Sequence, residues 1–433
     1  MNYYKAEVWD KVQKNFETFN DHCLHGVIRF DNLLDIKALR KAVWKISILF
    51  PIIRCRFVYD KKQARWEEIV NCTIDDLVSI FEVNLSGQKE DELIESTITQ
   101  RIVETAGPQL SVKLLRNNNT NDTLCIILNH MLCDGGGFKQ FLYLLCSQYN
   151  LAVSGEKDTK DYTFLQKRSD RQVYSDLTPK DYWKIITKSS FFEKPSPLIR
   201  FPFSNNNQQT HPHIFSSTIP PKQFEQLIAY TKKLHCTLND LFIAALFREI
   251  DQHIAISHFV PIIISCPVDL RRYIKDKQHI GLCNLASSFW CNIGLDVGKD
   301  LSETTRKVRD KVEIIKKNYP GLKSFYFLNS FLRLLSYATF EKRMKSFPNP
   351  LIGITNTGII EKKDLTFTNA SIKSAFINGS IKFAPYIQIA FSTYENELTI
   401  SINQYCTDED ASKIEKMLLS YRTQLESALT DLN

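Results

Sequence analysis

The sequence predicts a protein of mixed α/β layers, in which strand-like and helix-like stretches alternate along 433 residues. Apolar residues recur at every second position in some stretches and at every third or fourth position in others, which are the periods of strands and helices. No short repeat of fixed period interrupts this alternation. The chain is long enough for two or three compact domains or one large two-lobed body, and its 28 Phe and 17 Tyr can fill sizeable cores.

The first elements follow from local patterns. Residues 23–30 have the composition of a strand, and Asp35 is the expected N-cap of a helix that Pro51 ends. Residues 53–59 alternate apolar and polar side chains, which predicts a half-buried strand. Beyond them we expect a helix containing Ile94, Ile98 and Ile102, a strand over residues 110–116, and a buried strand over 123–128.

The buried strand over residues 123–128 is followed directly by Asn129, His130 and a glycine-rich turn over 133–137. A helix is expected over residues 138–149. Loops on a rigid scaffold often carry the chemistry of a protein, and this turn holds the most reactive combination of side chains in the chain.

The second half begins with a polar stretch over residues 152–179, which we interpret as a crossover between two lobes. Thr237 and Asp240 resemble a capping box that opens a helix. The remaining expected elements are helices over 221–235, 301–317, 322–345 and 408–429, strands over 260–265 and 351–356, a turn at Thr357 and Gly358, and alternating strands within 371–405.

The string His130-x-x-x-Asp134-Gly135 provides what acyl transfer needs. Neutral imidazole near pH 7 can take the proton of a hydroxyl or amine as it attacks a thioester. Glycines let a substrate approach closely and let the chain turn sharply. Asp134 would either orient His130 directly or brace the loop by pairing with an arginine. The alternative interpretation is a core histidine at the end of a strand.

This string resembles the HxxxDG signature of the superfamily that contains chloramphenicol acetyltransferases, nonribosomal peptide condensation domains, polyketide-associated acyltransferases and alcohol acetyltransferases. The stand-alone alcohol acetyltransferases and the polyketide-associated acyltransferases are the most similar branches. Weaker resemblances follow in the order of the family's motifs: Phe50 to Phe57, Pro267-Val268-Asp269-Leu270-Arg271 with Gly281 and Asn284, and Ile354-Thr355-Asn356-Thr357-Gly358.

The resemblance implies two chloramphenicol-acetyltransferase-like lobes, residues 1–160 and 170–433. Each lobe would be a mixed β-sheet flanked by helices, with an active-site tunnel between the lobes. His130 would be the general base, and no covalent acyl-enzyme is expected.

The resemblance also implies roles for other residues. Asp134, together with Gly135 part of the catalytic loop, would be held by Arg271 as the first choice of partner and by Arg54 as the second. Asn284 and Asn356 would donate hydrogen bonds near the reacting carbonyl, as oxyanion stabilisation requires, or would contact the substrate elsewhere. The alternative for both asparagines is a turn-forming role.

The sequence departs from condensation domains at Asn129, which stands where they usually have a first histidine. No adenylation or carrier segment accompanies the unit, so we expect a free-standing O- or N-acyltransferase with acyl-CoA as co-substrate and no permanently bound cofactor. The acceptor would be a small-molecule alcohol or amine. The alternatives are a condensation enzyme whose donor is linked to the phosphopantetheine of an acyl or peptidyl carrier protein, and a non-catalytic binding protein of the same fold.

Composition excludes several other classes. The net charge of +7 is spread along the chain, which gives no support to nucleic-acid binding. The 11 cysteines include no C-x-x-C pair, so neither a disulfide framework nor a zinc ribbon is expected. No carboxylate or thiol at ligand spacing accompanies His211 and His213, and no metal is expected. The N-terminus lacks the apolar core of a secretory signal, and no apolar run is long enough for a membrane span. We therefore expect a cytoplasmic protein.

Overall fold

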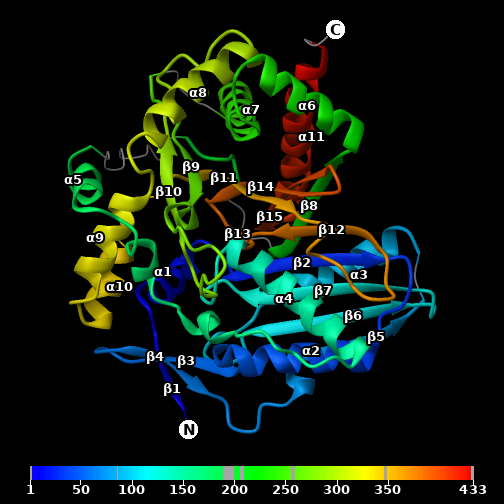
Figure 1. The fold of residues 1–433 in the computed structure, drawn as a ribbon. Coiled ribbons are helices and arrows are strands. Elements are labelled where there is room, and N and C mark those ends of the chain that lie inside the picture. The colour runs from blue at the N-terminus through cyan, green and yellow to red at the C-terminus, as the bar shows by residue number, and fades with distance from the viewer. Residues whose placement is uncertain are drawn as a thin grey trace.

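The structure is a computed structural model that describes residues 2–84, 86–188, 199–204, 209–254, 259–345 and 349–430. Residues 1 and 431–433, the outer ends of the two expected lobes, lie outside the described residues. Two large sheets dominate the fold (Figure 1), and a small antiparallel sheet of three strands lies beside the first. The small sheet consists of β1 (Tyr3–Lys5), β3 (Cys55–Tyr59) and β4 (Ala64–Glu68).

The first large sheet has five strands in the order β12-β2-β7-β6-β5. One face contributes Leu24, Ile28 and Ile126 to a core shared with two helices, and the opposite face contributes Val27 and Cys125 to a smaller cluster with a third helix. This alternation is the period of a strand that is buried on both faces. The elements are β2 (Cys23–Phe30), β5 (Val78–Val83), β6 (Leu110–Asn117), β7 (Asn121–Asn129) and β12 (Ile372–Asn378), with α2 (Ile36–Leu49) and α4 (Gly135–Ser154) on the first face and α3 (Gln88–Ile98) on the second.

The second large sheet has seven strands, in the order β10-β9-β11-β14-β15-β13 with β8 paired to β15. Its core is shared with four helices: α6 (Pro221–Lys233), α7 (Leu238–His253), α8 (Leu301–Lys316) and α11 (Asp408–Thr430). The strands are β8 (His211–Ile219), β9 (Ile264–Asp269), β10 (Ala286–Cys291), β11 (Ile352–Ile360), β13 (Lys382–Phe383), β14 (Ile387–Tyr394) and β15 (Glu397–Cys406). Smaller clusters hold α1 (Val8–Asn15), α5 (Pro179–Lys188), α9 (Leu322–Leu332) and α10 (Tyr337–Lys345).

Strand β12 connects the two halves of the chain. It comes from the second half of the sequence, yet it pairs antiparallel with β2 of the first sheet, with Ala375 opposite Ile28. Figure 1 shows β12, in orange, beside the blue β2. The expected division between residues 160 and 170 stays a prediction about the chain, and the first sheet itself is completed from beyond that boundary.

Local signals in the sequence define most helix ends. The Asp35 side chain accepts a hydrogen bond from the Ala38 N–H at the start of α2, and Thr237 and Asp240 form a capping box at the start of α7. None of the helices in the described part of the chain is both long and apolar enough to span a membrane.

Five expectations were inaccurate. Helix α3 ends at Ile98, so Ile102 lies beyond it, and strand β3 begins at Cys55, because residues 51–54 form a 3-10 turn. Strand β9 begins at Ile264, because its antiparallel partner β10 ends at Cys291 directly opposite. The helix expected over 322–345 is two helices, α9 and α10, separated at residues 333–336. Thr357 and Gly358, expected as a turn, lie within β11, where Gly358 has φ +74° and the pairing with β14 shifts register. A positive φ suits glycine, so the irregularity is a bulge in a continuous strand.

Candidate active site

His130 directly follows β7, and its main-chain N–H donates to the carbonyl oxygen of His22 at 2.6 Å. The imidazole is partly exposed to a cavity of about 270 Å³ that residues from both halves of the chain line, among them Pro267, Thr355 and Lys382. The Nδ1 atom is buried and makes no hydrogen bond of ordinary geometry among the described residues, although the Asn284 side chain and the main chain of His130 itself lie close enough to raise the pKa of the ring.

The pKa of His130 is lowered from its ordinary value, chiefly because burial disfavours the imidazolium ion. The positive charge of Lys382 lowers the pKa further, and the negative charge of Asp134 opposes it. His130 is therefore held neutral at pH 7, which is the state that can accept a proton.

Asp134 is 3% exposed and forms the N-cap of α4. One carboxylate oxygen accepts from the Gly137 N–H at 2.8 Å, and the other accepts from the Leu285 N–H at 2.6 Å. Arg271, on a short 3-10 turn after β9, lies 2.8 Å from Asp134 and also donates to the Cys283 carbonyl oxygen at 3.0 Å. Burial would raise the pKa of Asp134, but Arg271 and these N–H donors outweigh it, so the pKa is lowered.

The condensation-domain family model matches residues 11–279, which is more than half of the chain. The chain belongs to the condensation-domain family. No curated protein sequence matches it significantly.

Solved structures of low sequence identity share the fold over nearly the whole chain. The first condensation domain of the CDA synthetase has a TM-score of 0.68 at 13% identity, over 99% of this chain and 96% of that one. The TRI3 trichothecene 15-O-acetyltransferase of Fusarium sporotrichioides has a TM-score of 0.67 at 12% identity, over 98% and 95%. Polyketide synthase associated protein 5 of Mycobacterium tuberculosis has a TM-score of 0.64 at 16% identity, over 99% of each chain. Family membership supports acyl transfer as the general class of chemistry.

Arg54 was our second choice of partner for Asp134, and the structure of this condensation-domain protein contradicts it. The Arg54 guanidinium lies 2.9 Å from Glu68 of β4 and donates to the main-chain oxygen of Ser47. Arg54 therefore fixes the small sheet to the end of α2, and it takes no part in bracing the His130 loop.

Asn284 is close to His130, and its observed contacts are with the main chain of the loop. Its amide nitrogen donates to the main-chain oxygens of His130 and Met131, at 2.9 and 3.1 Å, and the residue is 4% exposed. The amide group is therefore engaged by the loop. Asn284 braces the main chain of the catalytic loop, and its expected contact with a reacting carbonyl stays a prediction.

Asn356 does not share a cavity with His130. It lines a second, larger cavity of about 590 Å³, together with Asn239, Asp269 and Arg271. Its amide nitrogen donates to Asn239 at 2.7 Å, and its oxygen accepts from the Gly358 N–H. Its neighbours Thr355 and Thr357 line the cavity of His130, because successive residues of a strand point to opposite faces. Asn356 therefore lies on the face of β11 opposite Thr355 and Thr357, and its expected contact with the reacting carbonyl or the substrate stays a prediction.

The glycines after Asp134 leave space that other groups occupy. A Cβ on Gly135 would lie 3.3 Å from a methyl carbon of Thr357, at the edge of the His130 cavity. A Cβ on Gly136 would lie 2.9 Å from a guanidinium nitrogen of Arg271. Glycine at these positions lets the first turn of α4 approach β11 and Arg271 closely.

Two further supports of the loop were missed. Arg168, in the crossover segment, donates to the main-chain oxygens of Met131 and Leu132 at 3.2 Å each, and makes a two-fold ion pair with Asp10 of α1. Asn129 accepts from the Met131 N–H at 2.8 Å. The position of Asn129 directly before His130 was a signal that could have found its role, whereas nothing in the sequence pairs Arg168 with Asp10.

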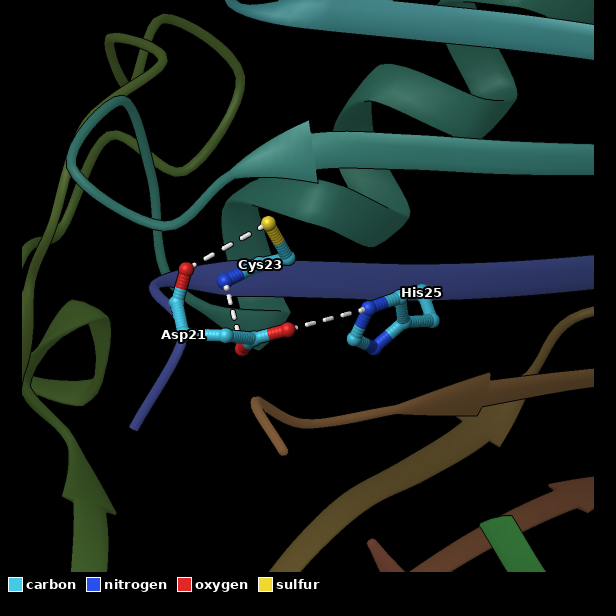
Figure 2. A group of neighbouring side chains, drawn as sticks. All are labelled: Asp21, Cys23 and His25. Atoms are coloured by element: carbon cyan, nitrogen blue, oxygen red, sulfur yellow. Dashed lines mark hydrogen bonds and ion pairs between the residues drawn. The ribbon is translucent and has the colours of Figure 1, made fainter. Parts of the chain in front are cut away.

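A buried polar group lies at the start of β2, beside the His130 loop: Asp21, Cys23 and His25 (Figure 2). Their side-chain donor atoms lie within 4.8 Å of one another, as a set of metal ligands would. Each is engaged by the protein, however. Asp21 accepts from the Cys23 N–H, the Cys23 thiol faces the Asp21 main-chain oxygen, and His25 Nδ1 donates to the carbonyl oxygen of Gly379. Burial raises the pKa of the Cys23 thiol well above its usual value, which keeps it a poor metal ligand. The arrangement is better explained as buried support for β2.

Proposed function

We propose that this protein is an acyltransferase that moves an acyl group from a thioester to a hydroxyl or amine, with His130 as the general base. The observation that carries the proposal is a neutral, partly exposed imidazole at a cavity, on a loop that is braced from both halves of the chain. A base is effective when its ring is fixed and its pKa lies near or below the working pH.

The chemistry follows from those two properties. As the acceptor oxygen or nitrogen attacks the thioester carbonyl, His130 takes its proton, and the same proton then protonates the departing thiolate. No nucleophilic side chain is required, so no covalent acyl-enzyme forms. The loop hydrogen bonds from Arg168 and Asn284 hold the main chain of the base in place during this transfer.

We assign the larger cavity to the donor arm. Its lining includes Arg272, Lys277 and Lys316, and the two cavities share Pro267. Cationic side chains suit the phosphates of coenzyme A or of a phosphopantetheine arm. Acyl-CoA is the donor that we favour, and a carrier-bound thioester is the alternative, because condensation domains of peptide synthetases share the fold.

The test is acceptor-dependent release of thiol from a panel of acyl-CoA donors with mixed alcohols and amines. Wild type should release thiol and His130→Ala should not. His279→Ala is the matched control, because His279 is exposed and lines neither cavity; it contacts Asp276 and the ring of Phe164. Activity that survives in His130→Ala would refute the assignment of the base. If no donor reacts, a carrier-loaded thioester is tried next, and failure there would favour a non-catalytic protein.

A further inference from the structure

Lys382 lies in the same cavity as His130 and has no assigned role. It is the first residue of the two-residue strand β13, paired with Gln404 of β15 and bridged to Asn20. Its side chain is half-buried and lines the 270 Å³ cavity. Within the described part of the chain, its ammonium group makes no hydrogen bond and no ion pair.

The cavity carries one uncompensated charge. Of the described residues that line it, only His130, Asp134 and Lys382 can be charged. Asp134 is neutralised by Arg271 at 2.8 Å, and His130 is held neutral by burial. The rest of the lining is apolar or carries neutral amides and hydroxyls. Lys382 therefore gives the cavity a net positive charge.

Asp21 is the anion whose charge acts on Lys382, but no ion pair joins the two among the described residues. One oxygen of Asp21 accepts the N–H groups of Cys23 and Ile381. Burial lowers the pKa of Lys382 to about 8, and Asp21 only partly opposes this. At pH 7 the group is still mostly protonated, as a partly desolvated cation, and such a cation gains strongly from a charge-assisted hydrogen bond to an anion.

We propose that Lys382 binds a carboxylate of the small molecule that occupies the His130 cavity, so that one of the two reacting partners is an acidic substrate. The part that this carboxylate plays in the reaction rests on the proposed function, whereas its binding to Lys382 does not. The cavity is at the small end of ligand sites, which suits a short carboxylate-bearing group. The carboxylate has two possible sources: a hydroxy or amino acid acceptor, or the distal end of a dicarboxylic acyl chain.

Binding is tested first, without turnover. Succinate, glutarate and butyrate, and the corresponding primary amides, are titrated into wild type by calorimetry. Carboxylates should bind at least about tenfold more tightly than their amides, as loss of a hydrogen bond between charged groups predicts. Lys382→Met should abolish this preference, Lys382→Arg should retain it, and His130→Ala should leave it intact. Equal binding of acids and amides by wild type, or a preference that survives in Lys382→Met, would overturn the proposal.

Turnover then identifies the source. A hydroxy acid and its methyl ester are compared as acceptors, and succinyl-CoA is compared with butyryl-CoA as a donor. Lys382→Met should raise KM for the charged member of one pair only, with little change for its neutral partner. If Lys382 were merely a counter-ion for Asp21, the variant would lower kcat and the melting temperature alike for every substrate, and the proposal would be wrong. Lys382-dependent binding without turnover of either CoA donor or of a carrier-loaded thioester would uphold the anion site and reject the acyltransferase.

Discussion

Replacing Asp134 with asparagine should destabilise the protein while leaving the shape of the loop nearly unchanged. Asparagine is close to isosteric and still offers one oxygen to an N–H donor. The substitution removes the negative charge that lies 2.8 Å from Arg271. It also places an NH₂ group against N–H donors such as that of Leu285, which in the wild type lies 2.6 Å from a carboxylate oxygen of Asp134. The guanidinium is left buried without its main counter-ion.

The magnitude follows from burial. Removing one partner of a buried ion pair costs about 3–5 kcal/mol. Arg271 keeps the Cys283 carbonyl oxygen and the exposed carboxylate of Asp269, so we expect a loss near the lower end, about 3 kcal/mol. An unfolding entropy of about 2.1 cal/mol/K per residue gives roughly 0.9 kcal/mol/K for 433 residues. The melting temperature should therefore fall by about 3 °C.

The assay is thermal unfolding at pH 7, with Asp269→Asn as the matched control. Asp269 is the other carboxylate near Arg271, but its side chain is 56% exposed, so its loss should cost at most about 1 kcal/mol. The double variant Asp134→Asn with Arg271→Met should recover part of the loss, since no buried charge is then left unpaired. Because the pKa of Asp134 is lowered in the folded protein, its contribution is present above pH 4 and disappears as the pH falls through the folded pKa. If Asp134→Asn and Asp269→Asn have the same melting temperature, the bracing role of Asp134 is refuted.

Three further outcomes are expected. The acidic limb of the kcat/KM–pH profile should lie below pH 6.5, because burial lowers the pKa of His130. Lys382→Met should move this limb to higher pH, because it removes a positive charge that lowers the same pKa. A limb at the same pH in the variant would contradict this. Gly281→Ala should lower the free energy of unfolding, measured with denaturant, by about 3 kcal/mol, because its Cβ would lie 1.8 Å from a main-chain oxygen. The control Gly353→Ala should lower it by less than about 1 kcal/mol, because the nearest atom to its Cβ lies at 3.4 Å. Arg168→Met should lower both stability and kcat, because it frees two carbonyl oxygens of the His130 loop; a stability loss with unchanged kcat would restrict Arg168 to a structural role.

Local sequence patterns were sufficient for most elements of the fold. The strand expected over residues 23–30 is β2, and the N-cap at Asp35 and the capping box at Thr237 are present. These features depend on neighbouring residues alone, through side-chain period and capping chemistry. The sheet order was beyond such patterns, because pairing β12 with β2 joins segments that lie far apart in the sequence.

The same limit explains what local patterns could not predict at the site. Arg54 and Arg271 both follow apolar stretches, and only the folded chain shows that one reaches Glu68 and the other Asp134. The face on which Asn356 lies depends on the register of β11, which a bulge at Gly358 shifts. Lys382 lacks any motif at all, and only the cavity that it shares with His130 singles it out.

The contacts of the His130 loop explain why the motif at residues 130–135 and the motif at residues 267–284 occur in one chain. Within the loop, Asp134 finds only the Gly137 N–H as a donor of its own, which is an ordinary helix cap. Besides Arg168, three further donors come from one short segment of the second half: Arg271 to Asp134, Asn284 to the His130 main chain, and the Leu285 N–H to Asp134, the last across 151 positions of sequence. The segment from Arg271 to Leu285 therefore completes the set of contacts that holds the His130 loop in place. Since the two parts belong to opposite halves of the chain, the position of His130 depends on how those halves pack, and any displacement between them would move the base as well as the cavity wall.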